Sequence, residues 1–288
     1  MSEKPPSDVP LPYADRPVAT APGHWVLARA GKRVLRPGGA ALTAAMLDHA
    51  RLPGSDVVEL APGLGRTAAE IVAARPASYT AIDRDLQAAA RVAAVVGDRG
   101  VVRQGEAADT GLDNACADVV VGEAMLTMQG DKSKAAIVAE AARVLRPGGR
   151  YAIHELGVAP DDIDEEYYTQ LRRDLARAIH VNARPMTAAA WRGLLEDAGL
   201  VVDWVDTAPM ALLKMSRNLR DEGPGGAARI MWNVMRDKAL RARVMEMRRT
   251  FTRYEKDMVG IALVAHKPEA GAGTAPEEAG AEGSSPEA

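Results

Sequence analysis

The stretch VVELAPGLGRTA, residues 57–68, indicates a buried strand that runs into a glycine-containing loop and then into a helix. Val57, Val58 and Leu60 form an apolar run suited to a strand covered on both faces, and helical composition begins at Thr67. Small residues in the loop let a ligand approach the backbone, and free amides at a helix start favour a polar or anionic group. The stretch therefore predicts a nucleotide site.

Strand-like and helix-like segments alternate after this loop, which is typical of a parallel sheet with helices on both faces. The predicted strands are 57–60, 78–82, 101–103, 118–121, 150–155, 201–206 and 259–265. The predicted helices are 24–35, 41–50, 134–145, 162–180 and 188–198. A tight turn is expected at Leu145-Arg146-Pro147-Gly148-Gly149. The fold class is therefore α/β.

Composition excludes several classes of protein. The 288 residues are 47% hydrophobic, which is enough for a full core, and the single cysteine, Cys116, rules out an internal disulfide and a cysteine-based metal cluster. The sequence has no apolar run of the ~20 residues needed to cross a bilayer and no secretory signal at its start. These features predict a soluble, cytoplasmic protein.

Three further regions have their own composition. Residues 1–22 are proline-rich and predict a flexible arm, and residues 267–288 predict a disordered acidic tail, with one lysine against five glutamates. Between them, residues 23–266 are expected to form one domain. Within it, residues 208–256 hold 12 lysines and arginines against five acidic residues and six of the 12 methionines. This segment predicts a helical insertion broken at residues 223–226.

The glycine loop is compatible with more than one nucleotide. Gly63, Gly65 and Ala68 satisfy the dinucleotide pattern GxGxxG/A, and Asp83 follows at the distance of a ribose-binding carboxylate. An NAD-linked oxidoreductase is therefore an alternative. Glu59, just before the glycines, would instead repel a pyrophosphate and attract the ammonium or sulfonium of an amino-acid-bearing cofactor. Glu106, beside the end of the third strand, can accept a hydrogen bond from an adenine amino group.

The chain resembles the class I S-adenosylmethionine-dependent methyltransferases over residues 55–156, and more loosely over residues 187–265. The residues that carry the resemblance are VVELAPGLG, AIDRD, GEAADTGLDNACADVVVGEAM and AARVLRPGGRYAIHEL. The resemblance implies a Rossmann-like sheet of seven strands with an antiparallel last strand, and S-adenosyl-L-methionine as the cofactor. A catalytically silent protein that only binds this cofactor is a further alternative.

The resemblance also implies which residues hold the cofactor. Glu59, Ala61, Gly63 and Gly65 would line the methionine moiety, and Asp83 would bind the ribose hydroxyls. Arg84 would lie beside the adenine, and Glu106 and Ala107 would flank its edge. Glu123, at the end of the fourth strand, is also assigned to the cofactor. Two positions depart from the family pattern: Ala61 replaces a frequent glycine, and Glu106 stands where aspartate is commoner.

Methyl transfer chiefly needs an aligned acceptor and sometimes a base. His154 is the candidate base by its intrinsic pKa, and Glu155 is expected either to touch substrate or to pair with an arginine such as Arg184. Met128, Asn182 and Arg184 are the candidate acceptor-binding residues. Three of these residues have a structural alternative: a hydrogen-bonded strand histidine for His154, and an anchor of the loop for Asn182 and Arg184.

The acceptor is expected to be a small and hydrophobic molecule, methylated on O, C or N. The methionines and Phe251 of the insertion recur at helical spacing and predict a lid, and its arginines are expected to allow peripheral contact with a membrane. No metal is expected, because the acidic cluster at residues 161–166 opens a helix, where negative charge is favourable. A nucleic-acid acceptor is not expected.

Overall fold

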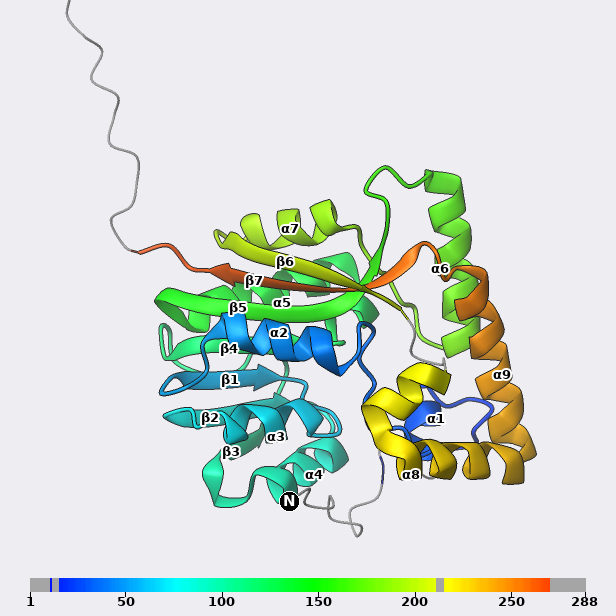
Figure 1. The fold of residues 1–288 in the computed structure, drawn as a ribbon. Helices are drawn as coiled ribbons and strands as arrows, with labels where there is room; N and C mark the ends of the chain where they lie inside the picture. Colours follow the sequence, from blue (N-terminus) through cyan, green and yellow to red (C-terminus); the bar gives the residue numbers. More distant parts are fainter. Residues whose placement is uncertain (1–10, 12–15, 211–214, 270–288) are drawn as a thin grey trace, which may run out of the picture.

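The structure is a computed structural model that describes residue 11, residues 16–210 and residues 215–269. Within this part of the chain, seven strands form one sheet in the order β3-β2-β1-β4-β5-β7-β6 (Figure 1). Strand β7 is antiparallel to β5 and β6, whereas the pairs from β3 to β5 are parallel. The predicted fold class is confirmed. The strands are β1 (Asp56–Leu60), β2 (Ser78–Asp83), β3 (Val101–Gln104), β4 (Ala117–Glu123), β5 (Leu145–Val158), β6 (Val201–Pro209) and β7 (Met258–His266).

Helices cover both faces of the sheet. One face carries α2, α3 and α4, and the other carries α5 and α7 (Figure 1). Alternate residues of one strand supply the two layers: Val57 belongs to the core under the first group, and Val58 to the core under the second. These helices are α2 (Ala40–Ala50), α3 (Arg66–Ala73), α4 (Leu86–Val96), α5 (Asp131–Val144) and α7 (Ala188–Glu196), with short 3-10 turns η1 (Gly97–Arg99) and η2 (Leu126–Met128).

Four further helices form a cap at the end of the sheet towards which β1 runs (Figure 1). They are α1 (Gly23–Arg29), α6 (Glu165–Ile179), α8 (Met215–Arg236) and α9 (Lys238–Arg253). Helices α1, α6 and α8 all pack on α9. Glu222 of α8 also accepts hydrogen bonds from the backbone N–H groups of Arg33 and Val34, at 2.7 and 2.8 Å. The insertion is thereby tied to the N-terminal part of the domain.

The insertion is helical, as predicted, and its break falls at the predicted glycines. Gly223 has φ 72° and ψ 173°, so the path of α8 is interrupted there, and Pro224 follows. Within the described residues, no helix is both long and apolar enough to cross a bilayer.

Three element predictions were wrong in detail. The helix predicted over 24–35 ends at Arg29, because Gly31, with φ 100°, turns the chain away. Helix α4, capped by the side chain of Asp85, was not predicted. The turn predicted at 145–149 lies inside β5, where the register shifts between the pair Ala117–Leu145 and the pair Val119–Arg150.

The two chain ends lie mostly outside the described residues. Of the predicted N-terminal arm, residues 16–22 are described almost wholly as turns and bends, and Ala21 is fully buried against the cap. Of the predicted acidic tail, Lys267 donates to the carbonyls of Ala142 and Leu145, at 2.7 and 2.9 Å. Residues 1–10, 12–15, 211–214 and 270–288 are outside the structural description.

Candidate active site

The glycine loop connects β1 to α3 and bends sharply at Ala61. Ala61, Gly63 and Gly65 all have positive φ, at 52°, 56° and 73°, and Gly65 is the N-cap residue of α3. Two bonds fix the loop against β2: the N–H of Ala61 donates to the carbonyl of Ile82 at 2.8 Å, and the N–H of Gly63 donates to Asp83 at 3.2 Å. The loop therefore holds the end of β1 beside the end of β2.

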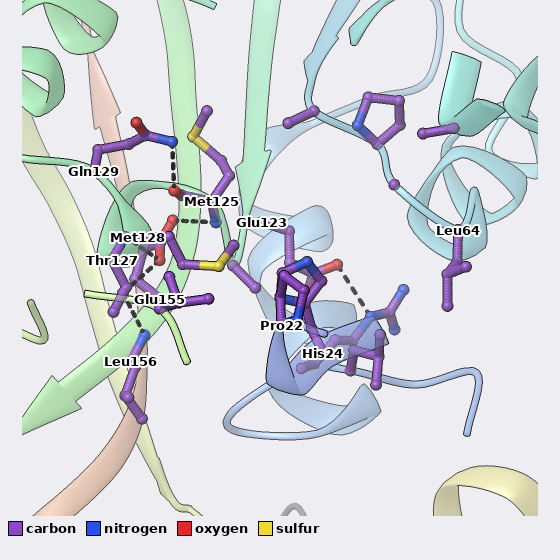
Figure 2. Close-up of a pocket in the computed structure, with 18 of the residues that line it drawn as sticks. Pro22, His24, Leu64, Glu123, Met125, Thr127, Met128, Gln129, Glu155 and Leu156 are labelled. Carbon is purple, nitrogen blue, oxygen red and sulfur yellow. Dashed lines mark hydrogen bonds and ion pairs between the residues drawn. The ribbon is translucent and has the colours of Figure 1, made fainter. Parts of the chain in front are cut away.

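A cavity of about 720 Å³ opens at the ends of β1, β2 and β4, under the cap. Most predicted site residues line it: Glu59, Ala61, Gly63, Asp83, Arg84, Glu106, Ala107, Glu123, Met128 and Glu155. The others, Gly65, His154, Asn182 and Arg184, are not among the lining residues. Figure 2 shows the β4 end of this cavity, with Met125 and Met128 on one side and His24 on another.

The two carboxylates at the ends of β1 and β2 are both buried. Burial raises the pKa of Glu59 to about 8, although the Tyr79 hydroxyl donates to it at 2.5 Å. Burial also raises the pKa of Asp83, against hydrogen bonds from the backbone N–H groups of Asp85 and Gly63. Glu59 is therefore mostly uncharged at neutral pH, and a cation bound next to it in the cavity would favour its ionised form.

Glu123, at the end of β4, is the centre of a buried polar network. Its carboxylate forms an ion pair with Arg36 Nε at 3.0 Å, accepts a hydrogen bond from His154 at 2.9 Å, and is hydrogen-bonded by the hydroxyls of Thr43 and Thr67. Burial opposes ionisation, but the charge of Arg36 and the contacts with His154 and Thr43 together outweigh it, and the pKa of Glu123 is lowered to about 2. The network joins the segment before α2 to β4, β5 and α3.

His154 is not placed as a base for a molecule in the cavity. Its side chain is fully buried, and its Nε2 accepts a hydrogen bond from the backbone N–H of Gly38 at 3.1 Å. A backbone N–H can only donate, so the ring proton lies on Nδ1, which faces Glu123. The geometry matches the structural alternative for this residue, a hydrogen-bonded histidine on a strand.

Glu155 holds the loop after β4. Its carboxylate accepts from the N–H groups of Met125, Leu126 and Thr127, at 2.9, 2.7 and 3.0 Å, and from the Thr127 hydroxyl at 2.7 Å (Figure 2). The expected pairing with Arg184 is wrong, because these four donors already occupy both oxygens of Glu155.

Arg184 and Asn182 belong to the loop after α6. The guanidinium of Arg184 pairs with Asp131 at 2.6 Å, and its N–H donates to the carbonyl of Thr127 at 2.7 Å. Asn182 is exposed. The structure thus gives Arg184 an anchoring contact and brings neither side chain to the cavity.

Two residues of the N-terminal segment contribute to the site and were not singled out in the sequence. Arg36 is buried between Glu70 and Glu123, and His24, on α1, lines the cavity. Neither lies in a recognisable motif. The position of His24 depends on how the cap folds over the sheet, and that of Arg36 on its contacts with α3 and β4; no local pattern encodes either.

Comparison with known proteins identifies the fold and its cofactor. A family model described as a methyltransferase domain matches residues 58–153, which contain β1 through most of β5. An uncharacterized protein from Haemophilus influenzae is 28% identical over 251 residues, covering 85% of this chain and 98% of that protein.

Solved structures share the architecture at low identity. Phosphoethanolamine N-methyltransferase 2 from Haemonchus contortus, in complex with S-adenosyl-L-methionine, is 14% identical with a TM-score of 0.66, over 90% of this chain and 60% of that one. The [4+2]-cyclase SpnF is 16% identical with a TM-score of 0.64, over 92% of this chain and all of that one.

The family match decides among the interpretations of the glycine loop. It covers the loop, Asp83, Glu106 and Glu123 in one unit, and its description names methyl transfer rather than dinucleotide oxidation. Residues 58–153 thus carry a methyltransferase domain, and the chain is an S-adenosylmethionine-dependent methyltransferase with S-adenosyl-L-methionine as its cofactor.

Proposed function

We propose that this methyltransferase acts on a small, largely hydrophobic molecule, which binds in the same cavity as the cofactor. One observation carries the proposal: the cavity extends without interruption from the buried carboxylate of Asp83 to an apolar wall on α6 and α9. A cofactor at the first end and an acceptor at the second would meet inside one enclosure, under the cap.

The cofactor end has a donor and acceptor set that fits a nucleoside with an amino-acid tail. Both backbone partners of Asp83 are N–H donors, and a carboxylate has further lone pairs free for ribose hydroxyls. Glu59 lies beside the glycine loop and would receive the ammonium group. We propose that Ala61, Gly63 and Gly65 flank the methionine moiety, and that Arg84, Glu106 and Ala107 flank the adenine.

Glu123 has a different part in this proposal. Its carboxylate is already engaged by Arg36, Thr43, Thr67 and His154. We propose that it shapes the wall next to the methionine moiety and holds the segment before α2 closed over the cofactor. His154 and Glu155 act as positioning residues, the first on Glu123 and the second on the loop of residues 125–127.

The bound cofactor supplies a methyl group on a sulfonium, which is a good leaving group. The protein's own contribution is then to hold the acceptor in line and to keep water out. The cap serves the second purpose, because α1, α6 and α9 all contribute to the cavity lining. We propose that the insertion acts as the lid of this site.

The acceptor end is apolar on several sides. Met128 and Met125 come from the loop after β4, Ile179 from α6, and Met247 and Phe251 from α9. Methionine side chains adapt to irregular apolar shapes, and such walls with a few polar groups are typical of sites for small hydrophobic ligands. This wall favours a hydrophobic acceptor over a sugar or a highly charged metabolite.

His24 supplies a polar group at this end. Burial lowers the pKa of His24 to about 4, so its ring is neutral at physiological pH. Among the described residues its ring contacts Trp25 at 4.9 Å between centroids, and no hydrogen bond to it is formed. We propose that His24 hydrogen-bonds the acceptor and orients the atom to be methylated.

The test is transfer of a labelled methyl group from S-adenosyl-L-methionine to an extract of the source organism, separated into organic-soluble, aqueous and macromolecular fractions. The proposal predicts label in the organic-soluble fraction, and loss of that label in Asp83→Ala. Asp113→Ala, an exposed carboxylate far along the chain from the loop, is the matched control and should retain it. Label confined to the macromolecular fraction, or no label in any fraction, would contradict the proposal.

A further inference from the structure

The outward face of α8 is apolar where a surface helix usually carries charge. Met231, Trp232 and Met235 are 46%, 60% and 63% exposed, and their spacing places them on one face. On the other side of the helix, Ile230 and Val234 pack into the cap. Helix α8 is therefore apolar towards the protein and towards solvent. Residues 231, 232 and 235 are called the Met-Trp face below.

Cations border the Met-Trp face directly. The guanidinium of Arg236 lies 5.4 Å from the centre of the Trp232 ring, and Arg241 donates to the carbonyl of Met235 at 3.2 Å. Lys238 lies between these two arginines in the sequence and is exposed. An apolar face with a cationic border is the usual composition of helices that lie in the interface of a membrane.

The charge of the chain is strongly divided. Residues 215–256 carry 11 lysines and arginines against five acidic residues, a net charge of +6, whereas the whole chain is −3. The remainder is therefore −9, so the positive charge is concentrated in the segment that presents the Met-Trp face. This distribution orients the molecule in the field of a negatively charged surface, with the insertion foremost.

We propose that the Met-Trp face and its cationic border dock on an anionic lipid surface. Trp232 and the two methionines would enter the boundary between headgroups and acyl chains, and the three cations would contact the anionic headgroups. A second copy of this chain is a poorer occupant, because two faces of net positive charge repel one another. A nucleic acid is also a poorer occupant, because Trp232 alone of the three residues supplies the kind of flat stacking surface that bases use.

This inference goes beyond the proposed methyl transfer, because docking needs neither cofactor nor acceptor. It can therefore be tested on the full chain by binding alone. The tryptophans make the test specific: Trp25 and Trp191 are buried, Trp204 stacks on His49, and Trp232 is the one of the four that is mostly exposed. Its fluorescence reports the environment of the Met-Trp face.

The experiment measures cosedimentation and tryptophan emission with vesicles of phosphatidylcholine and phosphatidylglycerol, and with phosphatidylcholine alone. We expect binding to the anionic vesicles that weakens with salt, with a blue shift of the emission. Trp232→Ser with Met235→Ser should weaken this binding about tenfold or more, since each exposed apolar side chain contributes to insertion. Trp232→Phe should retain most binding but lose the blue shift.

Val101→Ser with Val201→Ser is the matched control, because these residues are 51% and 47% exposed on the edge strands β3 and β6. It should bind like the parent chain. The proposal is overturned by equal binding to both vesicle types, by unchanged binding of the α8 double variant, or by absence of binding. Self-association or nucleic-acid binding that is lost in the α8 double variant would show that the Met-Trp face binds another partner, and would also overturn the proposal.

Discussion

The backbone N–H of Gly38 donates to Nε2 of His154 at 3.1 Å, and the opposite ring nitrogen faces Glu123 at 2.9 Å. This pair of contacts fixes the histidine as the neutral tautomer with its proton on Nδ1. The only free lone pair of the ring is used by a protein N–H, so none remains for a substrate proton. His154 joins the segment before α2 to the acid at the end of β4.

Replacing His154 by Gln should therefore affect stability more than proton transfer. We expect a loss of about 1–3 kcal/mol in the free energy of unfolding, because buried hydrogen-bonding groups lose their partners. The dependence of kcat on pH should keep its shape. Denaturant unfolding and a pH–rate profile measure the two effects, and the disappearance of one limb of the profile in His154→Gln would show that the residue is a base after all.

Glu59 should release a proton when the cofactor product S-adenosylhomocysteine binds. Burial raises the pKa of Glu59 to about 8, and the ammonium of the ligand would lower it again. At pH 7 the release should approach about one proton per site. Calorimetric titration in buffers of different ionisation enthalpy measures this number. In Glu59→Gln the release should be lost, and an unchanged release would place the ammonium elsewhere.

The same pKa gives the free protein a pH-dependent stability. Because the pKa of Glu59 is raised on folding from 4.5 to about 8, its contribution to stability is complete below about pH 4.5 and is lost as the pH rises through 8. Glu59→Gln should be nearly insensitive to pH in this window relative to the parent chain. If the free energy of unfolding of Glu59→Gln exceeded that of the parent chain by an amount that grows towards acid pH, the raised pKa of Glu59 would be contradicted.

Ala61→Gly should stabilise the protein. Ala61 has φ 52°, a left-handed conformation that costs an L-residue about 1–2 kcal/mol. Glycine adopts this conformation without that cost, but it also loses more backbone entropy on folding, so only part of the strain energy is gained as stability. We expect about 0.5–1 kcal/mol in the free energy of unfolding. Ala136→Gly, exposed within α5, is the control and should destabilise by about 1 kcal/mol. Destabilisation by both changes to the same extent would be inconsistent with the strained loop.

The sheet was predictable because each strand has a local signature. Short runs rich in β-branched residues, such as residues 57–60 and 118–121, are bounded by loops, and burial on both faces leaves them mostly apolar. Helix α4 was missed although Asp85 caps it and Ala88, Val92 and Val96 recur at helical spacing, a local signal that could have found it. The end of α1 was misplaced because Gly31 breaks a pattern that otherwise continues to Leu35.

The site was predictable only where chain-local motifs place residues at strand ends. Glu59, Asp83, Glu106 and Glu123 all follow or end parallel strands, and all line the cavity. His24 reaches the cavity through the packing of α1 on α9, helices that are far apart in the sequence, and Arg36 reaches it through its contacts with Glu70 of α3 and Glu123 of β4. His154 was assigned by its type, and only the structure could show that Gly38 occupies its free nitrogen.

Phe251→Ala should separate the acceptor from the cofactor. Phe251 lines the cavity from α9, away from the glycine loop, and truncation removes apolar contact area from the acceptor end. We expect KM for the acceptor to rise about tenfold while the affinity for S-adenosylhomocysteine stays within about twofold. Steady-state kinetics and calorimetry measure the two quantities. Thr252→Ala, exposed on the same helix, should change neither, and a loss of cofactor affinity in Phe251→Ala would contradict the proposed division of the cavity.

The most direct measurement is a crystal structure of the protein with S-adenosylhomocysteine bound. We predict that the ribose hydroxyls lie on the carboxylate of Asp83, that the ammonium group lies beside Glu59, and that the sulfur points towards Met128 and Phe251. A nucleoside bound outside this cavity, or bound within it without contact to Asp83, would contradict the account.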